Sequence, residues 1–240
     1  ISVLNDFQCH GVFKATDSDI HARDTVVNAD VFFDDLIIQC PSIHLESQKA
    51  TVKNSIFNSI DFTITGSNNA KDVIFTDSHL SAKTFVFLNC NYFKNATLIG
   101  FDDATVRHRI EGTLTLDDSK FITPSQHHYL GNKSIKIIGN TFISGSRAYS
   151  ETNLSFDGAD VHYDSLSLDN GATLTATNSQ VHITEDIFAF EGGIEIDSAS
   201  VVTAKHMTLE SRSSLKLTGN SVLAIRETTV TLEGSNIQSD

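Results

Sequence analysis

The stretch from Val181 to Ile196, Val-His-Ile-Thr-Glu-Asp-Ile-Phe-Ala-Phe-Glu-Gly-Gly-Ile-Glu-Ile, contains three short apolar runs of period two, at 181–183, 187–190 and 194–196. This period is typical of a β-strand with one buried face. Glycine and acidic residues separate the runs and favour turns between them. The same three runs then recur at 201–203, 207–209 and 215–217.

An apolar anchor residue returns at intervals of 18 to 23 residues, each time after a short turn of small or polar residues. The anchors are Phe57, Leu80, Leu98, Phe121, Phe142, Val161, Val181, Val201 and Val222. A fixed period near 20 indicates a solenoid, in which each repeat buries its apolar face only against its neighbours. Three strands and no helix per repeat predict an all-β fold. The expected architecture is a right-handed, single-stranded parallel β-helix with about 20 residues per coil and roughly eleven coils.

The turns before the anchors place small residues at equivalent positions, as in Asp118-Ser119 and Asn178-Ser179. Stacked coils lie about 4.8 Å apart, so bulky residues at these positions would collide. Asparagine and serine can instead hydrogen-bond from one coil to the next. We therefore expect hydrogen bonds that run along the stack of turns.

If the alternation holds, the residue after each anchor faces outward. That position reads Ile99, Ile122, Ile143, His162, His182, Val202 and Leu223. An apolar stripe of this kind predicts a partner surface, a covering loop or a shift of register.

The two histidines at this position, His162 and His182, should stack on neighbouring coils. They could be two ligands of a metal site, but no third ligand is evident. We expect stacked surface histidines, with no metal and no cofactor.

The 240 residues should form a single β-helix domain, with less regular coils over residues 1–52 and regular coils over 53–240. The pattern stops part-way through a coil at Asp240, which indicates a fragment of a longer chain. The chain has no apolar run of the length that spans a membrane.

Its three cysteines form no metal-binding or disulfide framework. We expect them to be buried fillers, with a Cys9–Cys40 bridge as the alternative.

The net charge of −13 argues against nucleic acid as a partner. Residues 105–147 differ from the rest because they carry six basic and three acidic residues. Within them, the segment 123–134 lacks clear alternation, so we expect it to form a loop. Tyr129 in this loop could stack on a sugar. The resulting candidate site for a glycan or another anion comprises Arg107, Arg109, His127, His128, Tyr129, Lys133, Lys136 and Arg147. The alternative is a basic region that only balances acidic neighbours.

Adjacent aspartates are candidate catalytic groups because glycoside hydrolases use two carboxyl groups. The pairs are Asp34-Asp35, Asp102-Asp103 and Asp117-Asp118. Adjacent aspartates in a solenoid are more typical of solvated turns. We therefore assign no catalytic residue, although the presence of an enzymatic activity stays open.

The repeats Ile196-Asp-Ser-Ala-Ser-Val201 and Leu217-Thr-Gly-Asn-Ser-Val222 resemble those of pectin-lyase-like β-helices, most closely the passenger domains of bacterial autotransporter adhesins. The resemblance covers residues 53–240. It implies a non-catalytic rod, secreted or displayed on the bacterial cell surface. Such a rod would bind host glycans or extracellular matrix proteins, or self-associate. The basic segment 105–147 favours an acidic glycan among these partners. The alternative is a polysaccharide-cleaving lyase or hydrolase, including phage tailspike-like proteins. The galacturonan hydrolases of this fold carry an Arg-Ile-Lys motif, whereas this chain has Arg109-Ile-Glu111.

Overall fold

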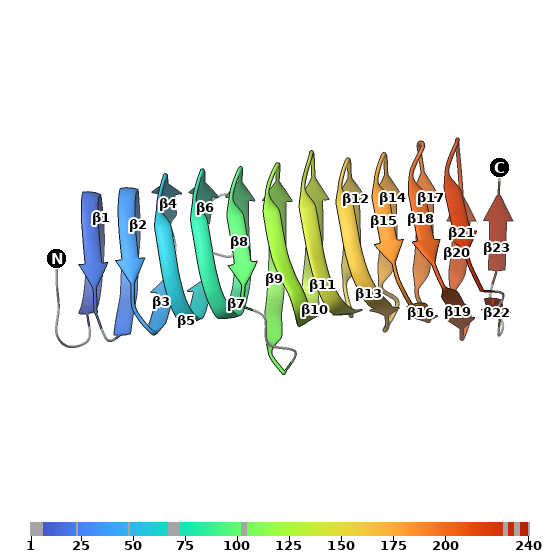
Figure 1. The fold of residues 1–240 in the computed structure, drawn as a ribbon, viewed down its shortest axis with the longest axis horizontal. Coiled ribbons are helices and arrows are strands. Elements are labelled where there is room, and N and C mark those ends of the chain that lie inside the picture. Colours follow the sequence, from blue (N-terminus) through green and yellow to red (C-terminus); the bar gives the residue numbers. More distant parts are fainter. Residues whose placement is uncertain are drawn as a thin grey trace.

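The computed structural model shows an all-β parallel solenoid of about ten turns, roughly 20 residues apart (Figure 1). The predicted fold class is therefore confirmed. The described part of the chain contains no helix that is long and apolar enough to cross a membrane. The structure describes residues 7–22, 24–47, 49–66, 73–101, 105–227, 230–232 and 236–239.

The strands are short in the C-terminal half, whereas several strands in the N-terminal half bend around the coil without a break. In chain order they are β1 (Phe7–His21), β2 (Asp24–Gln39), β3 (Ser42–Glu46), β4 (Ala50–Lys53), β5 (Ile56–Thr65), β6 (Val73–Thr76), β7 (His79–Lys94), β8 (Thr97–Gly100), β9 (Arg107–Asp117), β10 (Lys120–Ile138), β11 (Phe142–Ser150), β12 (Asn153–Asp157), β13 (Asp160–Leu168), β14 (Thr173–Thr177), β15 (Gln180–Ile183), β16 (Asp186–Phe190), β17 (Gly193–Asp197), β18 (Val201–Ala204), β19 (His206–Glu210), β20 (Ser214–Leu217), β21 (Val222–Ile225), β22 (Val230–Leu232) and β23 (Asn236–Ser239).

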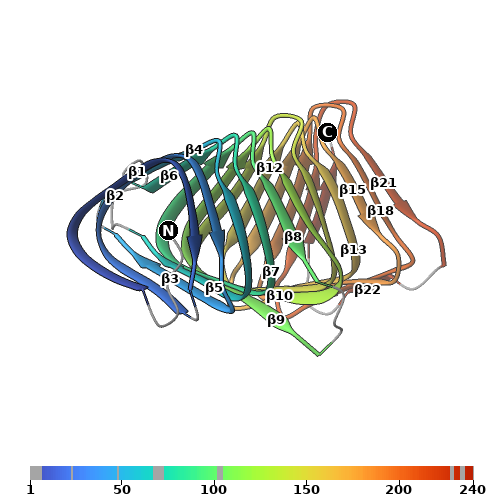
Figure 2. The ribbon, with the colours of Figure 1, turned by 60° about the vertical axis from the view of Figure 1, so that its left-hand side comes forward.

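Each coil contributes to three faces, which we number in chain order after the turn that precedes the anchor. The first face includes β8, β15, β18 and β21. The second includes β3, β16 and β19, and the third includes β4, β12, β14 and β17. Long strands belong to two faces: β13 pairs with β15 on the first face and with β16 on the second. All the pairings are parallel, so equivalent residues of successive coils form columns along the axis (Figure 2).

The core consists of the alternate side chains that point into the coil. Along β13 the exposed and half-exposed residues alternate with buried ones, which include Val161, Leu166 and Leu168. The N-terminal half of the core is rich in phenylalanines, whose rings contact one another mostly in edge-to-face or tilted arrangements. The largest side chains with less than 2% exposure include Phe33, Phe57, Phe62, Phe75, Phe85, Phe87, Phe93 and Phe121.

Three of the predicted anchors face outward, which corrects the expected register. Phe142 and Val201 are half-buried and Val222 is 48% exposed, while the next residues, Ile143 and Val202, are 3% and 0% exposed. The pairings agree, because Phe121 lies opposite Ile143 and Val181 opposite Val202. The expected apolar stripe is therefore interrupted. Ser144 and Thr203 occupy its positions beside the two histidines.

An additional residue in the turn before each of these anchors causes this shift, and the turn before Val222 has the same length as the turn before Val201. In the regular turn, the Oγ of Ser179 donates to the carbonyl of Thr177, two residues earlier. The Oγ of Ser200 instead donates to Asp197, three residues earlier. Thr141 likewise donates to the carbonyl of Ile138. The longer turns delay the next inward position by one residue, which moves the inward anchor from Val201 to Val202.

Buried hydroxyl groups connect the turns along the axis. The backbone N–H of Ser119 donates to Oγ1 of Thr141 at 3.1 Å. The N–H of Ala159 donates to Oγ of Ser179, and the N–H of Ser179 donates to Oγ of Ser200, each at 3.1 Å. The predicted hydrogen bonding from turn to turn is thereby confirmed.

The turns also explain the adjacent aspartates. Asp35 and Asp118 have φ angles of 53° and 48°, in the left-handed region that aspartate and asparagine tolerate better than most residues. Both pairs therefore mark turns, as expected. Asp102 and Asp103 lie outside the described residues.

The N-terminal residues that the structure describes also form coils, because β1 and β2 pair in parallel from Phe7 to His21. Cys9 and Cys40 form no disulfide with each other, so the alternative of a bridge between them is wrong, and Cys9 is half-buried instead of buried. Cys40 is buried, as predicted, and its thiol contacts Oγ1 of Thr25 at 3.2 Å. The side chain of Cys90 lies outside the described set.

Candidate functional site

The segment 123–134 is part of strand β10, and the predicted loop is wrong. The pairing of β10 with β11 shifts register between Thr123 and His127, and its pairing with β9 shifts between Asn132 and Ser134. These irregularities hide the alternation in the sequence while the backbone remains paired with its neighbours. The outward residues of this segment consequently belong to the second face, in columns with β9 and β11.

A groove with a volume of about 560 Å³ lies on that face. It extends across strands β9, β10, β11, β13 and β16. Its lining residues are Arg107, His127, His128, Tyr129, Arg147, Ala148, Tyr149, Ser165, Leu166, Ser167, Asp186 and Phe188.

One column of the groove alternates cationic and neutral groups. Arg107 lies opposite His127, which lies opposite Arg147, so the two arginines are two coils apart. Both arginines are exposed and form no ion pair with any residue of the described ranges. The pKa of His127 is lowered by burial and then by the positive charges of Arg147 and Arg107. At neutral pH the column therefore presents two guanidinium charges on either side of a neutral imidazole.

The next column contains a pair of stacked tyrosines. The rings of Tyr129 and Tyr149 are nearly parallel, at 12°, with centroids 5.7 Å apart. Both hydroxyl groups donate to the carboxylate of Glu151, at 3.0 and 3.1 Å. The hydrogen bond to Glu151 is the main cause of the raised pKa of Tyr129, and burial followed by the same bond raises the pKa of Tyr149 to about 12. Glu151 therefore holds the two rings as one flat apolar platform.

The structure brings four of the predicted residues together in the groove: Arg107, His127, Tyr129 and Arg147. Arg109 lies beside the groove, opposite Tyr129, and its Nε pairs with Oε1 of Glu111 at 2.5 Å. The remaining members of the predicted set are Lys136, Lys133 and His128.

Lys136 is exposed on the third face, opposite Thr115 and Ser155, so it does not join the arginines. The side chain of Lys133 lies outside the described residues. His128 lies beneath the groove and is only 1% exposed. Both of its ring nitrogens form hydrogen bonds with residues in the core.

Beneath the groove, His128 belongs to a buried polar cluster. Its Nε2 lies 2.6 Å from Oγ1 of Thr123, and that hydroxyl donates to the carbonyl of Ser144. Nε2 must therefore carry the proton, and Nδ1 accepts from the hydroxyl of Tyr163 at 2.7 Å. Burial lowers the pKa of His128 well below its usual range, and the charges of His108 and His127 lower it further. His128 is thus a neutral structural group.

His108 occupies the neighbouring position in the core. Its Nδ1 accepts from the backbone N–H of Phe85 at 3.0 Å, and its Nε2 bonds to Oε1 of Gln126 at 2.5 Å. Burial is the main cause of its pKa of about 4. Gly100 makes room for this pair, since a Cβ there would collide with Gln126. Neither buried histidine faces solvent.

Sequence reasoning missed Tyr149, Asp186 and Phe188 as groove residues. Tyr129 lies opposite Tyr149, Tyr149 opposite Ser167 and Ser167 opposite Phe188, at steps of 18 to 21 residues. The coil period could therefore have aligned Tyr149 with Tyr129. That signal depends on the register, which the irregularities in β10 obscure.

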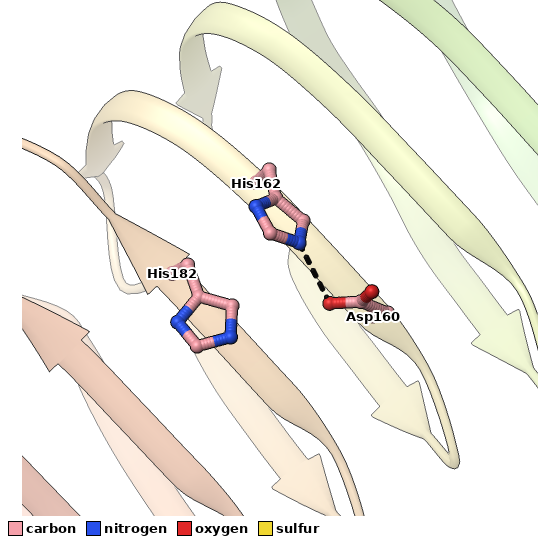
Figure 3. A group of neighbouring side chains, drawn as sticks. All are labelled: Asp160, His162 and His182. Carbon is pink, nitrogen blue, oxygen red and sulfur yellow. Dashed lines mark hydrogen bonds and ion pairs between the residues drawn. The ribbon is translucent and has the colours of Figure 1, made fainter.

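Outside the groove, the predicted stacking of His162 and His182 is confirmed. The residues are paired in β13 and β15, with ring centroids 4.9 Å apart. Asp160, on the same outer side of β13, supplies a third potential metal ligand, which the sequence pattern did not indicate (Figure 3).

Comparison with protein-family models, curated protein sequences and solved structures finds no match to this chain. The parallel β-solenoid is established by the coordinates. The likeness to pectin-lyase-like and autotransporter proteins rests on the repeat pattern alone.

Proposed function

We propose that this β-solenoid binds an acidic glycan in the groove, without cleaving it. The observation that carries the proposal is the placement of Arg107 and Arg147, which form no ion pair within the described residues, beside the stacked rings of Tyr129 and Tyr149. A guanidinium group binds a carboxylate or sulfate through paired hydrogen bonds. A flat aromatic platform offers the apolar surface on which one face of a sugar ring can stack.

The two columns indicate how such a glycan would lie. Both run along the solenoid axis, because they consist of register-matched residues of successive coils. The arginines are separated by two inter-strand spacings, or roughly 10 Å. A linear polymer with regularly repeated negative charges could follow this column while its rings contact the tyrosines. Ser165 and Ser167 lie farther along the same groove and offer hydroxyl groups.

The composition of the groove favours binding over hydrolysis. Glycoside hydrolases generally place two carboxyl groups about 5 to 9.5 Å apart around the scissile bond. Within the described part of the chain, Asp186 is the one acidic residue that lines the groove. Glu151, at the rim, already accepts both tyrosine hydroxyls. Together with the resemblance to adhesin passenger domains, this arrangement supports a role on the bacterial surface or in a secreted protein.

The test compares polygalacturonate with neutral dextran by isothermal titration calorimetry. We expect binding of polygalacturonate only, with affinity that falls as salt is added because exposed charges are screened. The double variant Arg107→Ser/Arg147→Ser should abolish binding. The control Lys136→Ser/Arg226→Ser removes the same charge from exposed residues outside the groove and should leave binding unchanged.

Equal loss of binding in both double variants would show that net charge, and not the groove, attracts the glycan. Binding of dextran with equal strength would also contradict the proposal. Release of new reducing or unsaturated ends during incubation would favour an enzyme instead.

A further inference from the structure

Three potential metal ligands converge on the first face of the solenoid, away from the groove on the second face. Asp160 and His162 are separated by one residue in β13, so both point outward. His182 is the register partner of His162 in β15. Figure 3 shows both imidazoles side by side and the Asp160 carboxylate directed toward His162.

The distances suit a shared ion. Nε2 of His162 is 2.8 Å from Oδ1 of Asp160, and one ligand atom from each of the three residues lies within 4.8 Å of the others. Zinc binds nitrogen and oxygen ligands at about 2.0 to 2.2 Å, so two ligands of one tetrahedral ion lie about 3.4 Å apart. His182 needs to approach by no more than about 1.4 Å, the difference between the 4.8 Å limit and the 3.4 Å separation, and the other pair must separate slightly. Rotation of partly exposed side chains can supply both changes, as the side chains of His162 and Asp160 are 43% and 51% exposed.

The contacts around His162 and His182 are those expected of histidines that bind a metal, because each imidazole ring is held in place by a neighbour. Nδ1 of His182 lies 3.1 Å from Oγ1 of Thr203, in the next coil. With the proton on Nδ1, that contact orients the ring and leaves the lone pair of Nε2 available, as with the outer-shell partners of metal-bound histidines. The ring of Phe142 packs against His162 at 5.2 Å between centroids. One imidazole is thus positioned by a hydrogen bond and the other by an aromatic contact.

We propose that Asp160, His162 and His182 bind a divalent first-row transition-metal ion, namely Zn²⁺. Two imidazoles and one carboxylate match the three-ligand sets of zinc sites that keep a fourth position open. Water, or a donor atom of a partner, would occupy that position. Calcium and magnesium are disfavoured because they require mainly oxygen ligands. The ion would join β13 to β15 and stabilise the contact between their coils.

The experiment titrates ZnCl₂ into the purified chain by calorimetry, with a reductant that does not bind zinc. The variants His162→Ala, His182→Ala and Asp160→Asn should each weaken binding about tenfold or more. Thr203→Val should weaken it by about tenfold, because it removes only the outer hydrogen bond. Zinc should also raise the melting temperature of the wild-type chain and not that of His182→Ala.

Two control variants address other zinc-binding groups. His206 lies 3.8 Å from Glu227, so His206→Ala removes a rival pair that lacks a second histidine. His44→Ala removes a half-exposed histidine on the second face. Both should bind as the wild type does. Substituting Co²⁺ should give a visible spectrum without intense thiolate bands, because the proposed ligands include no cysteine.

Wild-type affinity in the three ligand variants, or no binding by the wild-type chain, would overturn the proposal. Thiolate bands with Co²⁺ would place the ion at a cysteine and would also overturn it. Circular dichroism would verify that each variant retains its β-structure. These results are independent of glycan binding, since the groove shares no residue with this site.

Discussion

The hydroxyl of Tyr163 donates a hydrogen bond to Nδ1 of His128 across 2.7 Å, inside the solenoid. Tyr163 is 4% exposed and His128 is 1% exposed. Burial raises the pKa of Tyr163, and burial lowers the pKa of His128. Both groups are therefore neutral in the native state. Their bond is satisfied only while the imidazole remains unprotonated.

Acid should destabilise the fold through its two buried histidines. The pKa of His108 is about 4 in the native state against 6.5 in an unfolded chain, and that of His128 is shifted in the same direction. As pH falls from about 6.5 toward 4, the unfolded chain binds protons that the native chain does not, so stability falls. His108 alone should contribute a loss of roughly 3 kcal/mol over this range. Urea denaturation at a series of pH values measures it.

The control for that series is His79→Ala, which removes a half-exposed histidine from the first face. This variant should retain the full pH dependence between pH 6.5 and 4. A free energy of unfolding that stays constant through the same range would show that the buried histidines do not control acid stability.

Tyr163→Phe should destabilise the chain by about 1 to 3 kcal/mol, because it leaves Nδ1 of His128 without a donor in the core. Tyr129→Phe removes an equivalent hydroxyl whose partner, Glu151, is partly exposed. Water can replace that bond, so we expect a loss below about 1 kcal/mol. Thermal melts of the two variants at neutral pH provide the comparison. Equal losses would contradict the hydrogen-bond assignment in the core.

The register of β18 can be tested with two adjacent valines. Val202→Asp should unfold the local coils, because it buries an unpaired carboxylate at a position with 0% exposure. Val201→Asp should be tolerated, because Val201 faces outward and is half-buried. Hydrogen exchange of β15 and β18 would report both effects. Greater damage from Val201→Asp would restore the register that the sequence repeats suggest.

Ser179→Ala should cost about 1 to 3 kcal/mol although it removes a single atom. Its Oγ accepts from the buried N–H of Ala159 and donates to the carbonyl of Thr177. Ser146→Ala is the matched control, since the Oγ of Ser146 bonds only to the exposed carboxylate of Asp164. Chemical denaturation should separate the two variants. Indistinguishable denaturation midpoints would mean that the hydrogen bonds from turn to turn contribute little to stability.

Tyrosine emission should report occupation of the groove, because the chain has no tryptophan and two of its four tyrosines line the groove. Polygalacturonate should change the emission, and the change should disappear in Tyr129→Ala/Tyr149→Ala. Stacking on such rings contributes about 1 kcal/mol, so each single variant should weaken binding several-fold. An unchanged affinity in the double variant would remove the tyrosines from the proposed site.

The local sequence determines the architecture of this protein. The period-two runs within 181–196 identify the strands, and their return after about 20 residues identifies the solenoid. Small residues such as Ser119 and Ser179 reveal the stacked turns. These properties are readable because each coil contacts mainly its neighbours, so the fold is built from nearly local rules. The stacking of His162 on His182 follows from the same period.

Where a turn or strand departs from the regular period, only the tertiary structure decided whether each residue points into the coil or toward solvent. One additional turn residue exchanged the roles of Val201 and Val202. Irregular pairing within β10 placed His128 inside the coil and Tyr129 outside it. Because side chains alternate across a strand, a shift of one residue reverses inside and outside for all that follow. The groove depends on the assignments in β10, which is why the sequence located its neighbourhood but not its full membership. Asp160 lies in the regular register, and only the placement of its side chain showed that its carboxylate contacts His162.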